Sequence, residues 1–243
     1  MMFQVEHITV ELVGDEGTFL AVDDVSLTLE SSQIVDIVGP SGAGKSTFLH
    51  ALALLVPYRS GDLILDGRRV SSFAPTEWRS LVALVQQKPT LIEGSVQTNL
   101  LLPWTLKVRR EHKQPSFEEM RELLDRADLC DISLERSVFK LSVGQQARIA
   151  FIRTLLTSPK VLLLDEVDAA LDVDSTRAIG GLVTAFSRQG GAVLRVRHKI
   201  DDGRASYRCT FEDGCAGVLE SVSSPGNVAY ADDISCSETV PHE

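Results

Sequence analysis

The chain has 243 residues, 44% of them hydrophobic and 24% charged, and its formal net charge is −10. These values are ordinary for a soluble globular protein, and the length allows one elaborated α/β domain with a substantial core. Proteins that bind nucleic acid without sequence preference carry basic surfaces, so we expect no nucleic-acid partner. No apolar run approaches the ~20 residues of a membrane-spanning helix, so we expect the chain to cross no membrane by itself.

The first thirty residues alternate apolar and polar positions, as in the runs that begin at Val5 and Ala21. A period of two is typical of strands with one buried face. We therefore predict an antiparallel sheet at the N-terminus, with its turn at residues 14–17.

The strongest motif follows this sheet. Residues 39–47 read GPSGAGKST, which fits the phosphate-binding pattern Gly-x-x-x-x-Gly-Lys-Ser/Thr. An apolar run from Ile34 predicts a strand before it, and a run from Phe48 predicts a helix after it. In this order, backbone N–H groups and the helix N-terminus form a nest for phosphates. The predicted cradle consists of Gly39, Pro40, Ser41, Gly42, Ala43, Gly44, Lys45, Ser46 and Thr47.

Within this cradle two side chains can act on a bound nucleotide. Lys45 can reach the terminal phosphates, and the hydroxyl of Ser46 can ligate Mg²⁺. A strand from Val161 then ends in Asp165 and Glu166. A carboxylate in that position beside a phosphate loop can hold Mg²⁺, and its neighbour can deprotonate an attacking water.

Between these motifs the composition becomes polar and helical. Ser116 and Glu119 have capping-box spacing, and an apolar stripe follows them at helical spacing. The stripe fits either the core or a partner helix. Further on, a helix stops at Gly190 and a strand runs from Ala192, so strands alternate with helices. Such alternation predicts a mostly parallel sheet with ligands beyond the strand C-termini.

A third motif, LSVGQ, lies at residues 141–145. Ser142 and Gln145 have capping-box spacing, so a helix begins here with N–H groups exposed for a γ-phosphate. Gly144 has no Cβ to block close approach of its backbone.

In this order the three motifs resemble those of ATP-binding cassette (ABC) ATPases, over about residues 5–220. The resemblance implies an α/β P-loop NTPase with a mostly parallel central sheet and an N-terminal antiparallel β subdomain. It also implies a helical subdomain inserted at about residues 88–158 of a domain that spans 1–220. Residues 221–243, rich in Ser, Asp, Gly and Pro, form a polar tail.

The resemblance also assigns roles. Glu166 acts as general base, with Asp165, Ser46 and Gln87 on Mg²⁺, and Gln87 also contacts the attacking water. His198 positions the γ-phosphate, and Asp172 belongs to a loop at a dimer interface. Two copies pair head to tail and sandwich ATP, with Lys45 and Ser46 of one facing the signature residues of the other, which are Ser142, Gly144 and Gln145.

Two departures from the family pattern concern these expectations. Val143 replaces the first glycine of the signature, although its backbone N–H survives. No aromatic residue lies near Leu12 to Gly17, where the family stacks adenine, and Phe19 is the nearest.

A short cassette of this kind resembles the separate ATPase subunit of a transporter, docked on the inner face of the membrane through a permease. Residues 86–107, with Pro103 and Trp104, are similar to a group of iron-export ATPases. Phosphate-import and lipoprotein-release ATPases, and a nucleotide-gated regulatory module with weak hydrolysis, stay open as alternatives. The apolar stretch from Leu91 to Trp104 is the expected permease contact, although burial within the domain explains it equally well.

Overall fold

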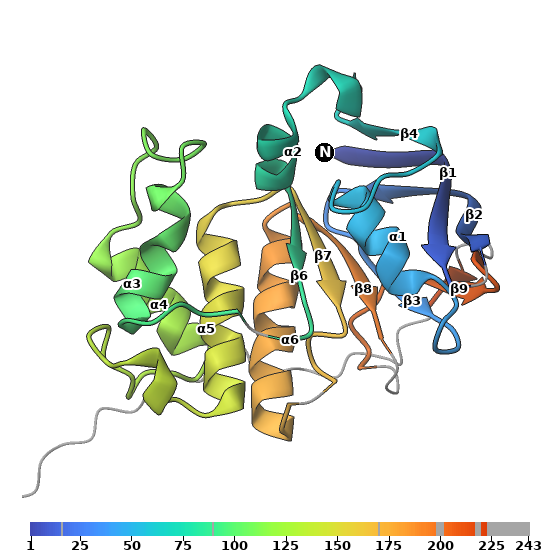
Figure 1. Cartoon of the computed structure of the whole chain (residues 1–243). Helices are drawn as coiled ribbons and strands as arrows, with labels where there is room; N and C mark the ends of the chain where they lie inside the picture. The colour runs from blue at the N-terminus through green and yellow to red at the C-terminus, as the bar shows by residue number, and fades with distance from the viewer. Residues whose placement is uncertain (16, 89, 170, 198–201, 217–219, 223–243) are drawn as a thin grey trace, which may run out of the picture.

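The computed structural model describes residues 1–15, 17–88, 90–169, 171–197, 202–216 and 220–222. Two sheets form its scaffold (Figure 1). The smaller sheet is antiparallel and has the strand order β2-β1-β4-β5. Its strands are β1 (Met2–Gly14), β2 (Gly17–Glu30), β4 (Ser60–Leu65) and β5 (Arg68–Arg69).

The larger sheet has the order β10-β9-β3-β8-β7-β6, with β11 also paired to β9. Its strands from β9 to β6 are parallel, and β10 and β11 join β9 antiparallel. Its members are β3 (Ile34–Val38), β6 (Val82–Val85), β7 (Val161–Asp165), β8 (Ala192–Val196), β9 (Tyr207–Glu212), β10 (Cys215–Ala216) and β11 (Glu220–Ser221).

Helices cover both faces of this sheet. Figure 1 places α1 near β1 and β2, while α3, α4 and α5 gather on the opposite side, beyond α6. The described helices are α1 (Lys45–Leu52), α2 (Pro75–Leu81), α3 (Val96–Leu101), α4 (Phe117–Arg126), α5 (Val143–Leu156) and α6 (Val173–Arg188). Short 3₁₀ turns occupy Val70–Ser72, Leu102–Thr105 and Val138–Lys140.

The core divides along the two faces of the parallel sheet. In β7, Val161 and Leu163 join the apolar cluster under α1 and the antiparallel sheet, whereas Leu162 and Leu164 join the cluster under α5 and α6. This alternation follows from the two-residue period of a strand. A strand buried on both faces therefore reads as a continuous apolar run, which is what the sequence has before Asp165.

The predicted fold class is confirmed by this architecture. The helix after the phosphate loop begins at Lys45 rather than at Phe48, because the loop's last residue, Gly44, is the helix N-cap. The capping box of Ser116 and Glu119 is present at the start of α4. The assignments of a helical subdomain to residues 88–158 and of a tail to residues 221–243 stay predictions, and residues 223–243 lie outside the described part.

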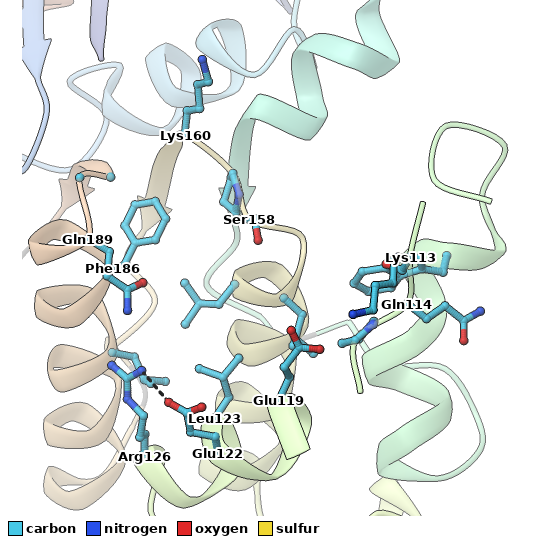
Figure 2. Close-up of a pocket in the computed structure, with 18 of the residues that line it drawn as sticks. Lys113, Gln114, Glu119, Glu122, Leu123, Arg126, Ser158, Lys160, Phe186 and Gln189 are labelled. Carbon is cyan, nitrogen blue, oxygen red and sulfur yellow. Dashed lines mark hydrogen bonds and ion pairs between the residues drawn. The ribbon is translucent and has the colours of Figure 1, made fainter. Parts of the chain in front are cut away.

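The apolar stripe of α4 belongs mainly to the core. Met120, Leu124 and Ala127 are buried, while Phe117 at the start of the stripe is exposed. Leu123 faces a cavity of about 600 Å³ between α4, α5 and α6, and Figure 2 shows Phe186 on the opposite wall. Lys160 and Gly191, which precede β7 and β8, also line it. The cavity therefore lies at the edge where the strands begin, away from the phosphate loop.

One feature of the core is charged. Asp36 in β3 and Arg195 in β8 are cross-strand neighbours, and both are buried. Arg195 donates to both carboxylate oxygens of Asp36, at 2.6 Å from Nε and 3.0 Å from Nη2. The same guanidinium contacts Asp202 at 3.1 Å. Burial raises the pKa of Asp202, but Arg195 and Arg197 outweigh that effect and hold the pKa at about 2, so Asp202 is ionised at neutral pH.

Candidate functional site

The phosphate loop joins β3 to α1 and bends through three glycines with positive φ. Gly39 has φ 149°, Gly42 has φ 85° and Gly44 has φ 88°. A Cβ on Gly39 would lie 2.1 Å from the carbonyl oxygen of Phe211, and one on Gly44 would lie 2.0 Å from that of Ala21. Conformation and space together therefore require glycine at both ends of the loop.

The ammonium of Lys45 lies over this loop and is almost fully buried. Its Nζ donates to the carbonyl oxygens of Gly39 at 3.0 Å and Pro40 at 2.7 Å. No side chain caps the helix at Gly44, so the N–H groups of the first turn of α1 are open to an anion. The remaining loop residues, Ser41, Gly42, Ala43, Ser46 and Thr47, complete the predicted cradle.

The end of β7 lies against the start of α1. The hydroxyl of Ser46 donates to Oδ1 of Asp165 at 2.8 Å, although 119 positions separate the two residues. A hydroxyl and a carboxylate at this distance are hard oxygen donors, which suit Mg²⁺. The structure thus brings together two of the three residues predicted to bind the metal.

Sequence reasoning missed a third side chain at this point. His50, one turn after Ser46 on α1, has Nε2 3.8 Å from Oδ2 of Asp165. That nitrogen is buried and has no hydrogen-bond partner among the described residues. The signal in the sequence was its position, four residues after Ser46, which places both side chains on one face of the helix.

Glu166 follows β7 in a strained backbone conformation. Its φ is 51°, which is unusual for a residue other than glycine. Its N–H donates to the carbonyl of Val196 at 3.3 Å, and its carbonyl accepts from Ala169 at 3.0 Å. These contacts place Glu166 beyond the C-terminal ends of β7 and β8, next to Asp165.

The other two residues expected at this edge are placed less fully. Gln87 lies two residues after β6, which pairs with β7, so it shares the edge where Asp165 lies. It is exposed, and its side chain makes no hydrogen bond with a described residue. His198 lies outside the described residues.

The signature motif forms the predicted capping box at the start of α5. Oγ of Ser142 accepts from the N–H of Gln145 at 3.2 Å, and Oε1 of Gln145 accepts from the N–H of Ser142 at 3.0 Å. Both side chains are thus engaged within their own helix. Val143 is 62% exposed, so solvent accommodates the β-branched side chain that replaces glycine.

Gly144 has a second reason to lack a Cβ. A Cβ there would lie 2.3 Å from Oγ of Ser175 and 3.0 Å from Oδ2 of Asp172. Asp172 is the N-cap of α6, where Oδ1 accepts from the N–H of Ser175 at 2.7 Å. These hydrogen bonds lower the pKa of Asp172. Within one chain Asp172 therefore contacts the signature helix.

Phe19 is the aromatic residue nearest to the phosphate loop on the N-terminal hairpin. It pairs across the hairpin with Leu12 and is 54% exposed. Ala21, two residues further along β2, carries the carbonyl that packs against Gly44. Phe19 therefore lies on β2, the strand that borders the cradle, and Leu12 lies beside it on β1.

Comparison with known proteins points to one family. A family model described as ABC transporter matches residues 22–169. The chain is 36% identical over 187 residues to "Probable iron export ATP-binding protein FetA" of Escherichia coli (strain K12), covering 76% of this chain and 81% of that protein. It is 33% identical over 222 residues to "ABC transporter I family member 17" of Arabidopsis thaliana, covering 90% and 81%.

Solved structures agree with these relatives. The protein in "Dimeric Structure of MJ0796, a Bacterial ABC Transporter Cassette" superposes with a TM-score of 0.78 at 25% identity, over 90% of this chain and 98% of that one. The protein in "Dimeric structure of a post-hydrolysis state of the ATP-binding cassette MJ0796 bound to ADP and Pi" gives a TM-score of 0.75 at 25% identity, with the same coverage.

We predict that Gly144→Ala lowers the free energy of unfolding by roughly 1–3 kcal/mol, because the new methyl group overlaps Ser175. Urea unfolding measures the change. Val143→Ala is the matched control, since an exposed neighbour changes stability by about 0.5 kcal/mol or less. Adding Ser175→Ala to Gly144→Ala should recover part of the loss. Equal stability of Gly144→Ala and the wild type would contradict the proposed packing.

Proposed function

This chain belongs to the ABC transporter family and is an ATPase, and we propose that it powers transport by a separate membrane permease. The observation that carries the ATPase chemistry is the hydrogen bond between Ser46 and Asp165. It joins the phosphate loop to the acidic end of β7 at one point, where the terminal phosphates of ATP would lie.

Magnesium is the metal that these donors fit. Ser46 and Asp165 would hold it, with Gln87 from the end of β6 as a third oxygen donor, and it would neutralise charge on the phosphates. His50 would support the second oxygen of Asp165, because its Nε2 lies 3.8 Å from that atom. Lys45 would exchange its two carbonyl contacts for the terminal phosphates.

Glu166 acts as the general base in this proposal. It lies next to Asp165 at the strand ends, where an attacking water in line with the γ-phosphate would have to sit. His198, two positions after the end of β8 in the sequence, would position the γ-phosphate.

A second copy completes each site. The capping box occupies the N–H groups of Ser142 and Gln145 within their own helix, and no capping side chain among the described residues bonds those of Val143 and Gly144. Solved relatives of this fold are described as dimeric. We propose a head-to-tail pair in which this helix start, with Gly144, faces ATP held by the other copy. Asp172, which contacts Gly144, lies at the same interface.

Permease docking is supported by a surface groove. Two adjoining cavities of about 290 and 270 Å³ share Leu55, Leu84, Arg153 and Thr154, and Pro103 lines the first. Burial lowers the pKa of Arg153, and its Nη1 has no hydrogen-bond partner among the described residues. A permease helix that offers a carbonyl or carboxylate there would satisfy it. Within the predicted stretch Leu91–Trp104, Val96, Leu100 and Trp104 are buried within the domain and are not available to a permease.

The chain would act on the inner face of the membrane through that permease. No helix in the described part has the length and apolarity to span a bilayer. We propose iron or another metal as the exported cargo, because one relative is described as a probable iron exporter. A methionine-import protein is also 33% identical to this chain, so methionine import competes with metal export. Phosphate import, lipoprotein release and a weakly hydrolysing regulatory module are the other outcomes that the tests below distinguish.

We predict that Glu166→Gln lowers kcat by about 100-fold or more, since a general base contributes roughly 10²–10⁴-fold. ATP affinity should stay near that of the wild type, and ATP should trap a stable dimer, measured by light scattering. Glu122→Gln on α4, an exposed carboxylate, is the control that keeps full turnover. Turnover of Glu166→Gln close to the wild type would remove the general-base role.

Adenine should stack on Phe19. Phe19→Ala then raises KM for ATP roughly tenfold with little change in kcat, in line with stacking energies of about 1–3 kcal/mol per base. Phe19→Tyr should retain the wild-type KM, and Val13→Ala, an exposed residue of the same hairpin, should not alter it. An unchanged KM in Phe19→Ala would place the base elsewhere.

The cargo is tested in proteoliposomes that contain this chain and its permease, for which a multi-spanning protein encoded beside its gene would be the candidate. Ferrous iron should raise the phosphate-release rate severalfold, whereas methionine and inorganic phosphate should not. Stimulation by either of those solutes, or by a lipoprotein, would replace the iron assignment. A rate that the permease does not raise would favour the regulatory module.

A further inference from the structure

Arg197 lies at the junction of the elements that carry the hydrolytic residues. It immediately follows β8, and its N–H donates to the carbonyl of Ile37 in β3 at 3.1 Å. β3 leads directly into the phosphate loop. The side chain of Arg197 is only 6% exposed, so its charge must be balanced within the protein.

Two carboxylates balance it. Nη2 of Arg197 donates to Oδ2 of Asp168 at 2.9 Å, and Nη1 lies 2.8 Å from Oδ2 of Asp202. The second contact is an ion pair without the alignment of a hydrogen bond. Asp168 and Asp202 are 15% and 18% exposed, so water screens both contacts weakly.

The Asp168 contact acts on the segment that carries Glu166. Asp168 is two residues after Glu166, and Ala169 closes a turn by donating to the carbonyl of Glu166 at 3.0 Å. Glu166 also donates its own N–H to Val196, the residue before Arg197, at 3.3 Å. The strained turn at Glu166 is therefore attached to the end of β8 at two points, one through its backbone and one through Arg197.

The Asp202 contact keeps the guanidinium in place. Arg195 also binds Asp202, and it donates two hydrogen bonds to the carboxylate of Asp36 in β3. Arg204 contacts Asp202 as well, at 3.3 Å. The described cluster contains equal numbers of acidic and basic side chains, namely Asp36, Asp168, Asp202, Arg195, Arg197 and Arg204. Within this cluster Arg197 joins Asp202 to Asp168, and Asp168 lies on the segment that carries Glu166.

We propose that Arg197 is a positioning residue for ATP hydrolysis. By binding Asp168, Arg197 holds the carboxylate of Glu166 in its place beside the phosphate loop. This inference rests on the proposed role of Glu166 as general base. Because misplacement of a reacting group by about 1 Å can cost 10²-fold in rate, loss of this contact should affect the chemical step. ATP binding should be spared, since Lys45 and the loop backbone do not depend on Asp168.

The test compares Arg197→Met with Arg204→Met in the full chain. Each removes one guanidinium from Asp202, and Arg197→Met also removes the ion pair with Asp168. We expect kcat of Arg197→Met to fall about 10–100-fold, with KM for ATP within about twofold of the wild type. Arg204→Met should keep both kcat and the KM for ATP within about threefold of the wild type. Arg197→Lys keeps the charge and can reach Asp168, so it should recover much of the lost kcat.

Combined variants connect the effect to Glu166. In a Glu166→Gln background, Arg197→Met should cause no further loss, because the group that it positions is already gone. Arg197→Met with Asp168→Asn should be no slower than Arg197→Met alone. Additive losses in either pair would overturn the proposal. So would a folded Arg197→Met with wild-type kcat, or equal losses in Arg197→Met and Arg204→Met.

The two proposals fail in different ways. If Glu166→Gln turns over normally, the general-base role is wrong. If Glu166→Gln stalls while Arg197→Met is unaffected, only the role of Arg197 is wrong. Should Arg197→Met not fold, Arg197→Lys and Asp168→Asn carry the test, with a kcat loss of about three- to tenfold in Asp168→Asn expected at unchanged KM. Wild-type kcat in Asp168→Asn would then overturn it.

Discussion

Parallel pairing of β3, β8, β7 and β6 is the constraint on which the site depends. In a parallel sheet the carboxyl ends of all strands meet at one edge. Here those ends carry the phosphate loop, the residue before His198, the pair Asp165 and Glu166, and Gln87. Residues separated by up to about two thirds of the sequence thus converge because these parallel strands are neighbours in the sheet. The hydrogen bond from Ser46 to Asp165 is the local result of that convergence.

Much of this arrangement could be predicted from the sequence, because it depends on local patterns. Backbone conformation requires Gly39 and Gly44 in the phosphate loop, and both occupy glycine positions of the motif. The capping boxes at Ser116 and Ser142 are likewise local, since they join residues three apart. The parallel sheet followed from alternation of apolar strands with helices.

Contacts between distant segments could not be predicted in the same way. The packing of Gly144 against Ser175 joins two helices whose relation is set by the whole core, so no spacing rule indicates it. The charged cluster is a similar case, because Asp36 and Arg195 lie 159 positions apart. The sequence does contain a signal, which is one charged residue within each of two apolar strands. A single such residue is ambiguous, but two of opposite sign on neighbouring strands indicate a buried pair.

This pair also limits how the protein can change through evolution. Loss of Arg195 leaves the buried carboxylate of Asp36 without its partner, and loss of Asp36 leaves Arg195 to share Asp202 with Arg197 and Arg204. Breaking a buried pair in this way costs about 3–5 kcal/mol, a large part of the stability of a typical domain. Replacement of both by apolar residues can be neutral. Asp36 and Arg195 should therefore be inherited together or lost together, and descendants that retain only one of them should be rare. β3, which leads into the phosphate loop, and β8, which leads to His198, should therefore change together in evolution at these two positions.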